Sequence, residues 1–277
     1  ASTFGVCAGR IPTCRGAAGW ACDFPATYRA VEAICDALDN DCDGTRDEGC
    51  LAPVGASDLR VDLGDTASSE NSINPDILGD GGSNVWLTWM DLRGGGIAHT
   101  NFGRSTDGGS NWSAATRLDS AGGPTFGPRL TFSGIDDVSV AWGDFRGGTT
   151  YREIYGRFST NAGSTFAANQ KINTGATAAL DSFDIDVASS GSNVYAVWET
   201  FVTNRRRHVF FARSTDGGST WGAETQVSTP TGVTFVAASP VVAASGANVY
   251  VAWRDNRNSG LDIYLRRSTN SGASFVV

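Results

Sequence analysis

The sequence predicts an all-β protein: a four-bladed β-propeller preceded by a small disulfide-rich module with a calcium loop. Three observations support this expectation. The 277 residues include 35 glycines and 8 prolines, which is typical of short strands joined by many tight turns. One pattern of strand and turn recurs four times from about residue 57. All six cysteines lie within the first 50 residues, so we expect two domains, at 1–51 and 52–277.

Composition narrows the classes of partner. The formal net charge is −8, which argues against a nucleic-acid partner, because phosphate binding requires a basic surface. No apolar run approaches the roughly 18 residues that a membrane-spanning helix requires. We therefore expect no nucleic acid and no membrane span.

The N-terminal cysteines form two matching triads. Cys7, Cys14 and Cys22 recur 28 residues later as Cys35, Cys42 and Cys50. An even number of cysteines at this density indicates a disulfide framework and an oxidising compartment, although the spacing leaves the pairing open. Zinc is the rival interpretation, but no Cys-x-x-Cys pair exists and both histidines lie far downstream.

The second triad encloses an acidic loop. Its predicted metal ligands are Asp39, Asp41, Asp43, Thr45, Asp47 and Glu48. Carboxylates at alternate positions followed by a glycine are what an oxygen-ligand calcium loop requires, with the next carbonyl pointing inward. The twelfth position, usually a bidentate glutamate, is a cysteine here, so other carboxylates must complete the shell. The alternative is a solvated acidic turn held by disulfides.

This acidic region resembles the short cysteine-rich metal-binding motif of secreted bacterial proteins, including copper-binding proteins related to the methanotroph outer-membrane protein. The matching residues are 32–36, 39–44, and 47–48. The resemblance implies a secreted, extracellular or cell-surface location. Copper prefers imidazole or sulfur ligands and this loop offers oxygen, so we assign calcium as the expected cofactor.

The rest of the chain is a fourfold repeat. A turn that begins with Ser-Thr-Asp or Ser-Thr-Asn occurs at 105–112, 159–166, 214–221 and 268–275. Its third residues are 54, 55 and 54 positions apart, and a run of alternating apolar residues ends at Trp89, Trp142, Trp198 and Trp253. Self-similarity at this period, with short strands, predicts propeller blades.

Four elements are expected in each repeat. Inner strands are predicted around 76–78, 129–131, 184–186 and 241–243. The tryptophan-ending strand follows, then a third strand such as 262–265, then the turn and an outer strand such as 225–227. In the turn, Asp or Asn hydrogen-bonds the backbone ahead of it and glycine accepts a positive φ. The closing aromatic residue packs between sheets.

These turns resemble the Asp-box repeats of sialidases and related bacterial propellers, over about the last 220 residues. The resemblance implies the fold, and it implies that Asp107 and Asp216 are structural, because the boxes of that family lie away from the active site. A sialidase also needs an arginine cluster, a tyrosine nucleophile with its glutamate, and an aspartate acid, built on six blades. We predict no catalytic and no cofactor-binding residue here.

Two further sets of residues have a structural and a functional interpretation. Three repeats carry Trp-x-Asp-x-Arg, at 89–93, 142–146 and 253–257, and the third repeat breaks the pattern with Thr200 and Val202. We expect this pair to brace neighbouring blades, because repetition follows architecture. Asp76, Arg129 and Asp184 begin inner strands. We expect them to line the mouth of an axial channel, where they either bind a cationic group or pair with one another.

The ends of the repeat region carry a prediction about association. The fourth repeat stops after its Asp box, and residues 57–63 look like an outer strand with no repeat before them. This segment either closes the ring within its own chain, which we expect by default, or completes the open edge of a neighbour.

The function that we predict is a secreted, non-enzymatic structural or adhesive protein that self-assembles into a surface layer or filament. The first alternative is a carbohydrate-binding propeller, a lectin that uses exposed aromatic residues at one face. The second is a sialidase-like glycoside hydrolase, which requires two carboxylates across a cleft.

Overall fold

The structure of the protein is a computed structural model. It describes residues 13–14, 20–21, 59–62, 71–93, 96–120, 122–133, 136–146, 150–203, 206–229 and 235–276. The chain divides into two compact units, Ala1–Arg60 and Val61–Val277. In the first unit, the short strands β1 (Thr13–Cys14) and β2 (Trp20–Ala21) pair antiparallel. The predicted disulfides, the acidic loop and the domain boundary at 51 concern residues outside the described ones, apart from the backbone of Cys14.

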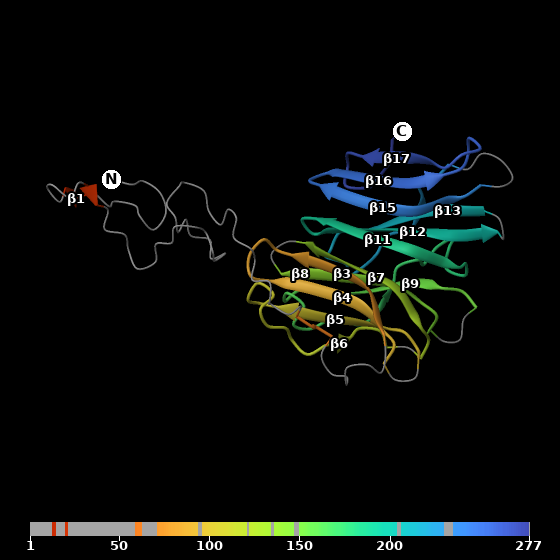
Figure 1. Ribbon diagram of the computed structural model, residues 1–277. Helices are drawn as coiled ribbons and strands as arrows, with labels where there is room; N and C mark the ends of the chain where they lie inside the picture. Colours follow the sequence, from red (N-terminus) through yellow and green to blue (C-terminus); the bar gives the residue numbers. More distant parts are fainter. Residues whose placement is uncertain are drawn as a thin grey trace. The chain divides into compact units, whose positions relative to one another are not determined.

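The second unit contains four antiparallel sheets, each built from consecutive strands in chain order (Figure 1). The first sheet holds β3 (Ser72–Gly79), β4 (Val85–Asp91), β5 (His99–Ser105) and β6 (Thr116–Arg117). The second holds β7 (Thr125–Ser133), β8 (Asp137–Asp144), β9 (Glu153–Ser159) and β10 (Gln170–Lys171). The third holds β11 (Ser182–Ser190), β12 (Asn193–Thr203), β13 (Arg206–Ser214) and β14 (Thr225–Gln226). The fourth holds β15 (Ala237–Ser245), β16 (Asn248–Asp255) and β17 (Asp262–Ser268).

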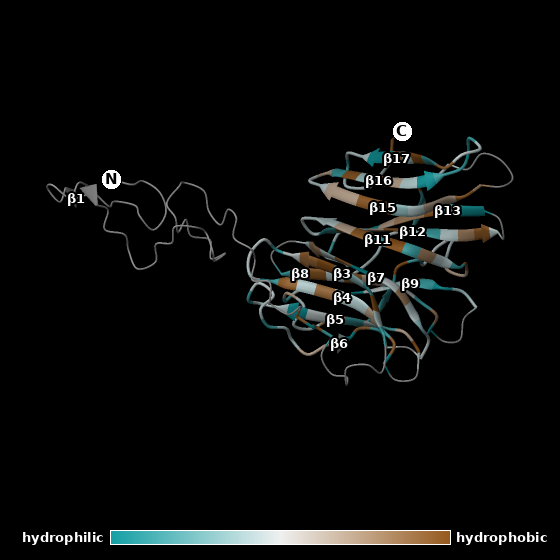
Figure 2. Cartoon of the chain, in the orientation of Figure 1, coloured by the Kyte–Doolittle hydropathy of each residue, from teal (hydrophilic) through white to brown (hydrophobic). Residues whose placement is uncertain are grey.

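The all-β architecture and the predicted order of elements are confirmed. Each sheet has its inner, tryptophan-ending and third strand, and the first three sheets also have a short outer strand. Along the strands, brown apolar stretches alternate with white and teal hydrophilic ones (Figure 2). No described helix is long and apolar enough to cross a membrane.

Every inner strand carries a β-bulge at the same repeat position. Asn74, Gly127, Asp184 and Ser239 have φ values of 53°, 51°, 49° and 51°. The register against the second strand shifts at this position in all four sheets. Left-handed backbone is costly for non-glycine residues, least so for Asn and Asp. The bulge bends each inner strand and shifts its register, and the residues before the bulge still pair with the end of the second strand.

Each Asp box is held by hydrogen bonds between its own residues. In the first box, Ser105 Oγ accepts the amide of Gly109 at 2.9 Å and Asp107 Oδ1 accepts the amide of Asn111 at 2.8 Å. Hydrogen bonds from the Asn111 side chain, from its amide and from Ser105 lower the pKa of Asp107 to about 2. Asp216 accepts equivalent bonds in the third box. Both carboxylates therefore hold their own turns.

Each sheet packs one face against the next sheet along the chain. Trp86 and Phe102 of the first sheet share a buried cluster with Val138, Val140 and Trp142 of the second. Similar apolar clusters join the second sheet to the third and the third to the fourth. The inner strands β3, β7, β11 and β15 lie next to one another in that order. Burial of these large side chains is the main stabilising contribution.

The two outward faces of this stack of sheets are exposed. Val241, Ile263 and Leu265 on the fourth sheet are 56%, 78% and 56% exposed, and Ile77 on the first sheet is 62% exposed. Figure 1 shows β3–β6 and β15–β17 at opposite ends of the stack. A ring closed by four sheets would bury these side chains, so the closure expected from the sequence is not seen. The repeat determines how one sheet packs on the next, and it does not determine the rotation between them.

The predicted closing strand differs as well. The described part of that segment, residues 59–62, forms no strand, and Asp62 accepts a hydrogen bond from Ser72 Oγ at 2.7 Å. Beside β17, Val276 exchanges backbone hydrogen bonds of 2.8 and 3.3 Å with Arg267. The predicted outer strand at 57–63 is therefore not seen in its described part, residues 59–62.

Candidate functional site

Three sheets end their second strand with a carboxylate brace. In the second sheet, Asp144 accepts the indole Nε1 of Trp142 at 3.0 Å and the amide of Arg146 at 2.7 Å, and it pairs with the Arg146 guanidinium. Asp91 and Asp255 make the same contacts in their sheets. Burial would raise the pKa of Asp91 and Asp255, but the hydrogen bonds from their arginine partners outweigh it and lower both. Each brace lies within one sheet, which corrects the expectation that it joins neighbouring blades.

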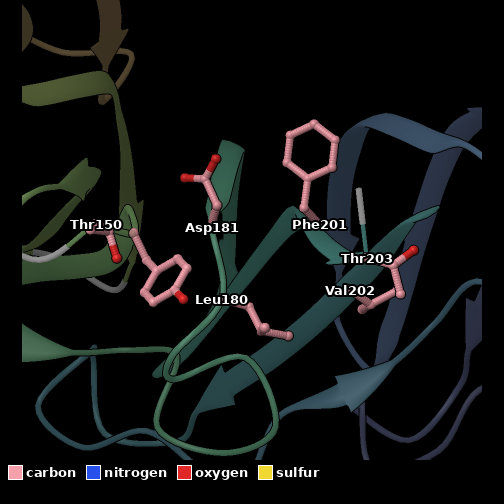
Figure 3. A pocket seen from close by; sticks show the side chains of 7 residues that line it. Thr150, Leu180, Asp181, Phe201, Val202 and Thr203 are labelled. Carbon is pink, nitrogen blue, oxygen red and sulfur yellow. The ribbon is translucent and has the colours of Figure 1, made fainter. Parts of the chain in front are cut away.

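The third sheet lacks this brace and has a pocket in its place. Thr200 and Val202 replace the Asp and Arg, and the buried Nε1 of Trp198 has no hydrogen-bond partner among the described residues. A pocket of about 540 Å³ opens beside Val202 (Figure 3). It is lined by Thr150, Tyr151, Leu180, Asp181, Phe201, Val202 and Thr203.

An ion pair and two aromatic rings stand beside this pocket. Arg152 Nε and Nη2 donate to the two oxygens of Asp181 at 2.7 and 2.8 Å. The Arg152 guanidinium also lies over the ring of Phe183, 4.2 Å from its centroid, and Phe183 packs against Phe201 with centroids 5.2 Å apart. Burial would raise the pKa of Asp181, but the hydrogen bonds and charge of Arg152 lower it, so Asp181 is ionised at neutral pH.

A second break in the repeat opens a smaller pocket. In the first sheet Met90 Sδ accepts the amide of Gly127 at 3.3 Å, and in the third Glu199 Oε2 accepts the amide of Ser239 at 2.9 Å. Each of these side chains reaches the bulge of the next inner strand. In the second sheet this position is Gly143, which has no side chain. A pocket of about 220 Å³ lies there, lined by Asn74, Phe126, Gly127, Arg129, Gly143, Arg152, Phe183, Asp184 and Ile185.

The two pockets are neighbours. Arg152 and Phe183 line the smaller one, and their contact partners Asp181 and Phe201 line the larger one. Figure 3 shows Leu180 and Asp181 on one segment and Phe201 to Thr203 at the end of β12. Both pockets lie at the junction of the second and third sheets, at the strand ends away from the Asp boxes. We call this pair the junction site.

The predicted axial residues are partly brought together. Arg129 and Asp184 line the smaller pocket and also a third one of about 270 Å³. Asp76 lines neither of them, and its Oδ2 accepts the amide of Leu130 at 2.8 Å. The structural counterpart of Asp76 in the third sheet is Asp186, which accepts the amide of Val242 at 2.8 Å, whereas Asp184 occupies the bulge. The sequence analysis aligned Asp184 with Asp76, and this alignment was wrong by two residues.

Glu199 is a buried carboxylate at the edge of the junction site. Its Oε1 accepts from Arg207 Nη1 at 3.0 Å, and its side chain is inaccessible to solvent. Burial raises the pKa of Glu199, and the charge of Asp184 raises it further, against the hydrogen bonds from Ser239 and Arg207. Because both oxygens are occupied, Glu199 orders the start of the fourth sheet.

The described residues of the second unit offer no candidate metal site. Among the described residues, no group of three His, Cys, Asp or Glu side chains could hold an ion. The predicted calcium ligands lie outside the described residues: Asp39, Asp41, Asp43, Thr45, Asp47 and Glu48.

Sequence reasoning singled out Arg129 and Asp184 and noted the break at Val202, but it missed Arg152, Asp181 and the absent side chain at Gly143. The available signal was the break in the repeat at Gly143 and Val202. Repeated residues hold the sheets, so a position that departs from the repeat is free to form a site.

Comparison with known proteins identifies the fold. No family model and no curated protein matches the sequence. An α-L-arabinanase from Penicillium chrysogenum, solved with arabinobiose, aligns with a TM-score of 0.54 at 15% identity over 74% of this chain and 66% of its own. A Hadza microbial sialidase gives 0.51 at 12% identity over 74% and 46%. A Trypanosoma rangeli sialidase, solved with the inhibitor DANA, gives 0.50 at 14% identity over 75% and 38%.

These similarities show a sialidase-like β-propeller fold, which bears out the fold implied by the Asp boxes. The chain spans between 38% and 66% of the length of these three proteins. At a sequence identity of 12 to 15%, the similarity to these proteins establishes the fold alone.

Proposed function

We propose that this protein binds a carbohydrate in the junction site. The observation that carries the proposal is the loss of two filling side chains, at Gly143 and Val202, from adjacent places in a repeat that otherwise fills them. The resulting space is concave and mixes charged groups, hydroxyl groups and aromatic rings. Such a lining is typical of small-molecule sites.

The chemistry of the lining suits a sugar. Tyr151 is 44% exposed, and with Phe201 it offers aromatic surface for the apolar face of a pyranose or furanose ring. Thr150 and Thr203 supply hydroxyl groups, and Asp181 supplies an ionised acceptor for sugar hydroxyl groups.

Positive charge in the smaller pocket favours an acidic sugar. Arg129 donates to the carbonyl of Pro128 at 3.0 Å and makes no ion pair with any described residue. Its remaining donors can grip a carboxylate in a bidentate manner. Asp184, on the rim of the same pocket, can accept from hydroxyl groups of the same ligand.

The structural neighbours support this class of ligand. One of them was solved with arabinobiose and two are sialidases, and each has the fold found here. We therefore place a carbohydrate ligand above the structural and adhesive role that the sequence alone favours. Adhesion to a glycan-bearing surface would unite the two proposals.

We propose binding without hydrolysis. Glycoside hydrolysis requires two carboxylates across the cleft, one of which donates a proton. Here Asp181 is held by Arg152, Glu199 is enclosed with both oxygens bonded, and Asp184 is the exposed carboxylate of the smaller pocket. Turnover of a fluorogenic sialoside or arabinoside by the full chain would contradict this proposal and establish a glycosidase.

Filling the junction site is expected to abolish carbohydrate binding. Val202→Arg restores the residue of the other sheets and occupies the larger pocket. Gly143→Met restores the residue of the first sheet, and a Cβ at Gly143 meets nothing closer than 3.6 Å, so the backbone there accepts a side chain. We expect each variant to weaken binding at least tenfold, about 1.4 kcal/mol. Calorimetric titration with arabino-oligosaccharides, sialyllactose and glucuronate-containing oligosaccharides measures the loss.

The matched control is Ala223→Arg, which adds the same charge at an exposed position outside the junction site. It should bind like the wild type. The proposal would be wrong if Val202→Arg and Gly143→Met bound sugar as tightly as Ala223→Arg does. It would also be wrong if the wild type bound no sugar of any class. Preference for the sialylated and uronic probes would assign Arg129 its role with acidic sugars.

We further propose that the four sheets are blades of a propeller and that the protein is secreted. We also propose that its N-terminal module is held by disulfides and binds calcium in the acidic loop. Equilibrium dialysis of the full chain should show one bound calcium ion that the double change Asp41→Asn and Asp43→Asn removes, because both carboxylates are lost from the loop. Asp80→Asn, an exposed aspartate of the second unit, is the control. Equal calcium content in wild type and double variant would contradict the loop assignment.

A further inference from the structure

The outward face of the fourth sheet is built like an internal face. At the repeat position of Ile263, the residues of the first three sheets are Thr100, Ile154 and Val209, all 0% exposed, whereas Ile263 is 78% exposed. At the position of Leu265, Phe102 and Phe211 are 1% and 2% exposed, whereas Leu265 is 56% exposed. The fourth sheet therefore presents apolar side chains that the other sheets bury against a following sheet.

At the internal junctions, this face rests on the Asp box of the following sheet. A Cβ placed on Gly163 would lie 2.6 Å from the ring of Phe102, and a Cβ on Gly272 would lie 2.6 Å from the ring of Phe211. Because the box glycine has no side chain, an aromatic ring of the preceding sheet can pack directly against its backbone. The closing aromatic of the box completes the contact, as Phe102 and Phe166 show with ring centroids 4.8 Å apart.

The first sheet offers the same surface, and no described residue of the second unit covers it. Gly109 is the equivalent glycine of the first box, and no atom lies within 4 Å of a Cβ placed there. On the inner strand, Ile77 is 62% exposed, while its counterparts Leu130 and Val187 are 6% and 9% exposed. The first sheet therefore has the receiving face that the Leu265 position fits.

Polar groups match in the same direction. Arg104 Nη1 donates to the carbonyl of Ala162 in the next box at 3.1 Å, and Arg213 Nη1 donates to the carbonyl of Ser271 at 2.9 Å. Arg267 occupies this donor position in the fourth sheet and is exposed. In the first box, the acceptor position is the carbonyl of Gly108.

We propose that the fourth sheet of one copy packs on the first sheet of a second copy, head to tail, and so repeats the internal junction between sheets. The occupant is a second copy of this chain, because the donor and receiving faces of the junction both exist on this molecule and both are exposed. Such an interface is heterologous. It closes into a ring when the rotation between copies allows and otherwise extends as a filament.

This contact is independent of the junction site, which lies between the second and third sheets. Loss of sugar binding in the Val202→Arg variant would leave the assembly intact. Loss of assembly would leave sugar binding intact, so the two proposals fail separately.

Two single variants test the direction of the contact. Leu265→Asp places a charge on the donor face and Ile77→Asp on the receiving face, and both positions are exposed, so each variant should fold like the wild type. In sedimentation velocity we expect the wild type to associate and each variant alone to remain monomeric. An equimolar mixture should form a one-to-one dimer and nothing larger, because only one undamaged pair of faces remains.

Ala223→Asp, an exposed alanine of the third repeat, is the control and should associate like the wild type. A wild type that stays monomeric at high concentration overturns the proposal and points to a different occupant, such as a further repeat. Association of Ile77→Asp on its own indicates contact between two fourth sheets and also overturns it. Absence of a dimer in the mixture does the same, while circular dichroism confirms the fold of each variant.

Discussion

Replacing Gly163 by alanine is expected to lower the free energy of unfolding by about 3 kcal/mol. Gly163 has a φ of 78°, where an L-residue costs about 1–2 kcal/mol. Its new Cβ would also meet the ring of Phe102 at 2.6 Å, and such overpacking costs about 1–3 kcal/mol. Urea unfolding, followed by tryptophan fluorescence, measures the loss as a shift of the midpoint.

Gly109 supplies the matched control for this change. It occupies the same box position with a φ of 93°, but its Cβ would meet nothing within 4 Å. Gly109→Ala should therefore cost only the backbone strain, about 1–2 kcal/mol. In a Phe102→Ala background, Gly163→Ala should fall to the same value, because the clash is gone. Equal losses for Gly163→Ala and Gly109→Ala would show that the packing of box on sheet contributes nothing.

Replacing Asp144 by threonine is expected to cost about 3 kcal/mol, because it leaves the Arg146 guanidinium and the Trp142 indole nitrogen without their shared acceptor. Asp144 is inaccessible to solvent, and removal of one partner from a buried ion pair is strongly destabilising. Denaturant unfolding at neutral pH measures the change.

The third sheet shows how this loss can be recovered. It carries Thr200 and Val202 where the second carries Asp144 and Arg146. The double change Asp144→Thr and Arg146→Val should therefore lose less than Asp144→Thr alone, by about 1–2 kcal/mol, since no charge is left unpaired. A double variant less stable than the single would mean that the stacking of Arg146 on Tyr155, 3.4 Å from its centroid, stabilises the protein by more than the loss of Asp144 as the guanidinium's partner costs.

The contrast between braced and unbraced sheets also explains the place of the junction site. In the second and fourth sheets, which keep the Trp-x-Asp-x-Arg pattern, the arginine lies over an aromatic ring: Arg146 over Tyr155, and Arg257 over Tyr264 at 3.9 Å. Where the pattern is broken, the strand end opens into the larger pocket. The repeat thus marks the site by its interruptions.

The calcium loop and the disulfides depend on residues in the first 51, and they remain predictions from ligand type and spacing. The repeat region is different, because its periodic residues could be checked against the described sheets. There the order of strands and the hydrogen-bonded Asp boxes were predicted correctly. The closing residues Phe166 and Phe275 pack against an aromatic ring of the preceding sheet as expected, whereas Trp112 contacts its own sheet.

The sequence by itself determined the features that depend only on residues close to one another within one repeat. The Ser-Thr-Asp turn, the strand that ends in tryptophan and the all-β class follow from hydrogen bonds and side-chain alternation over some ten residues. Only the tertiary structure decided the open ends of the stack, the bulge that offsets Asp184 from Asp76, and the pockets beside Gly143 and Val202. The open ends and the pockets arise between neighbouring sheets whose repeats lie 54 or 55 residues apart in the chain, and a break in the repeat marks a position without showing the space that it leaves. The bulge shifts the register between an inner strand and the strand that follows it, and residue type does not reveal that shift.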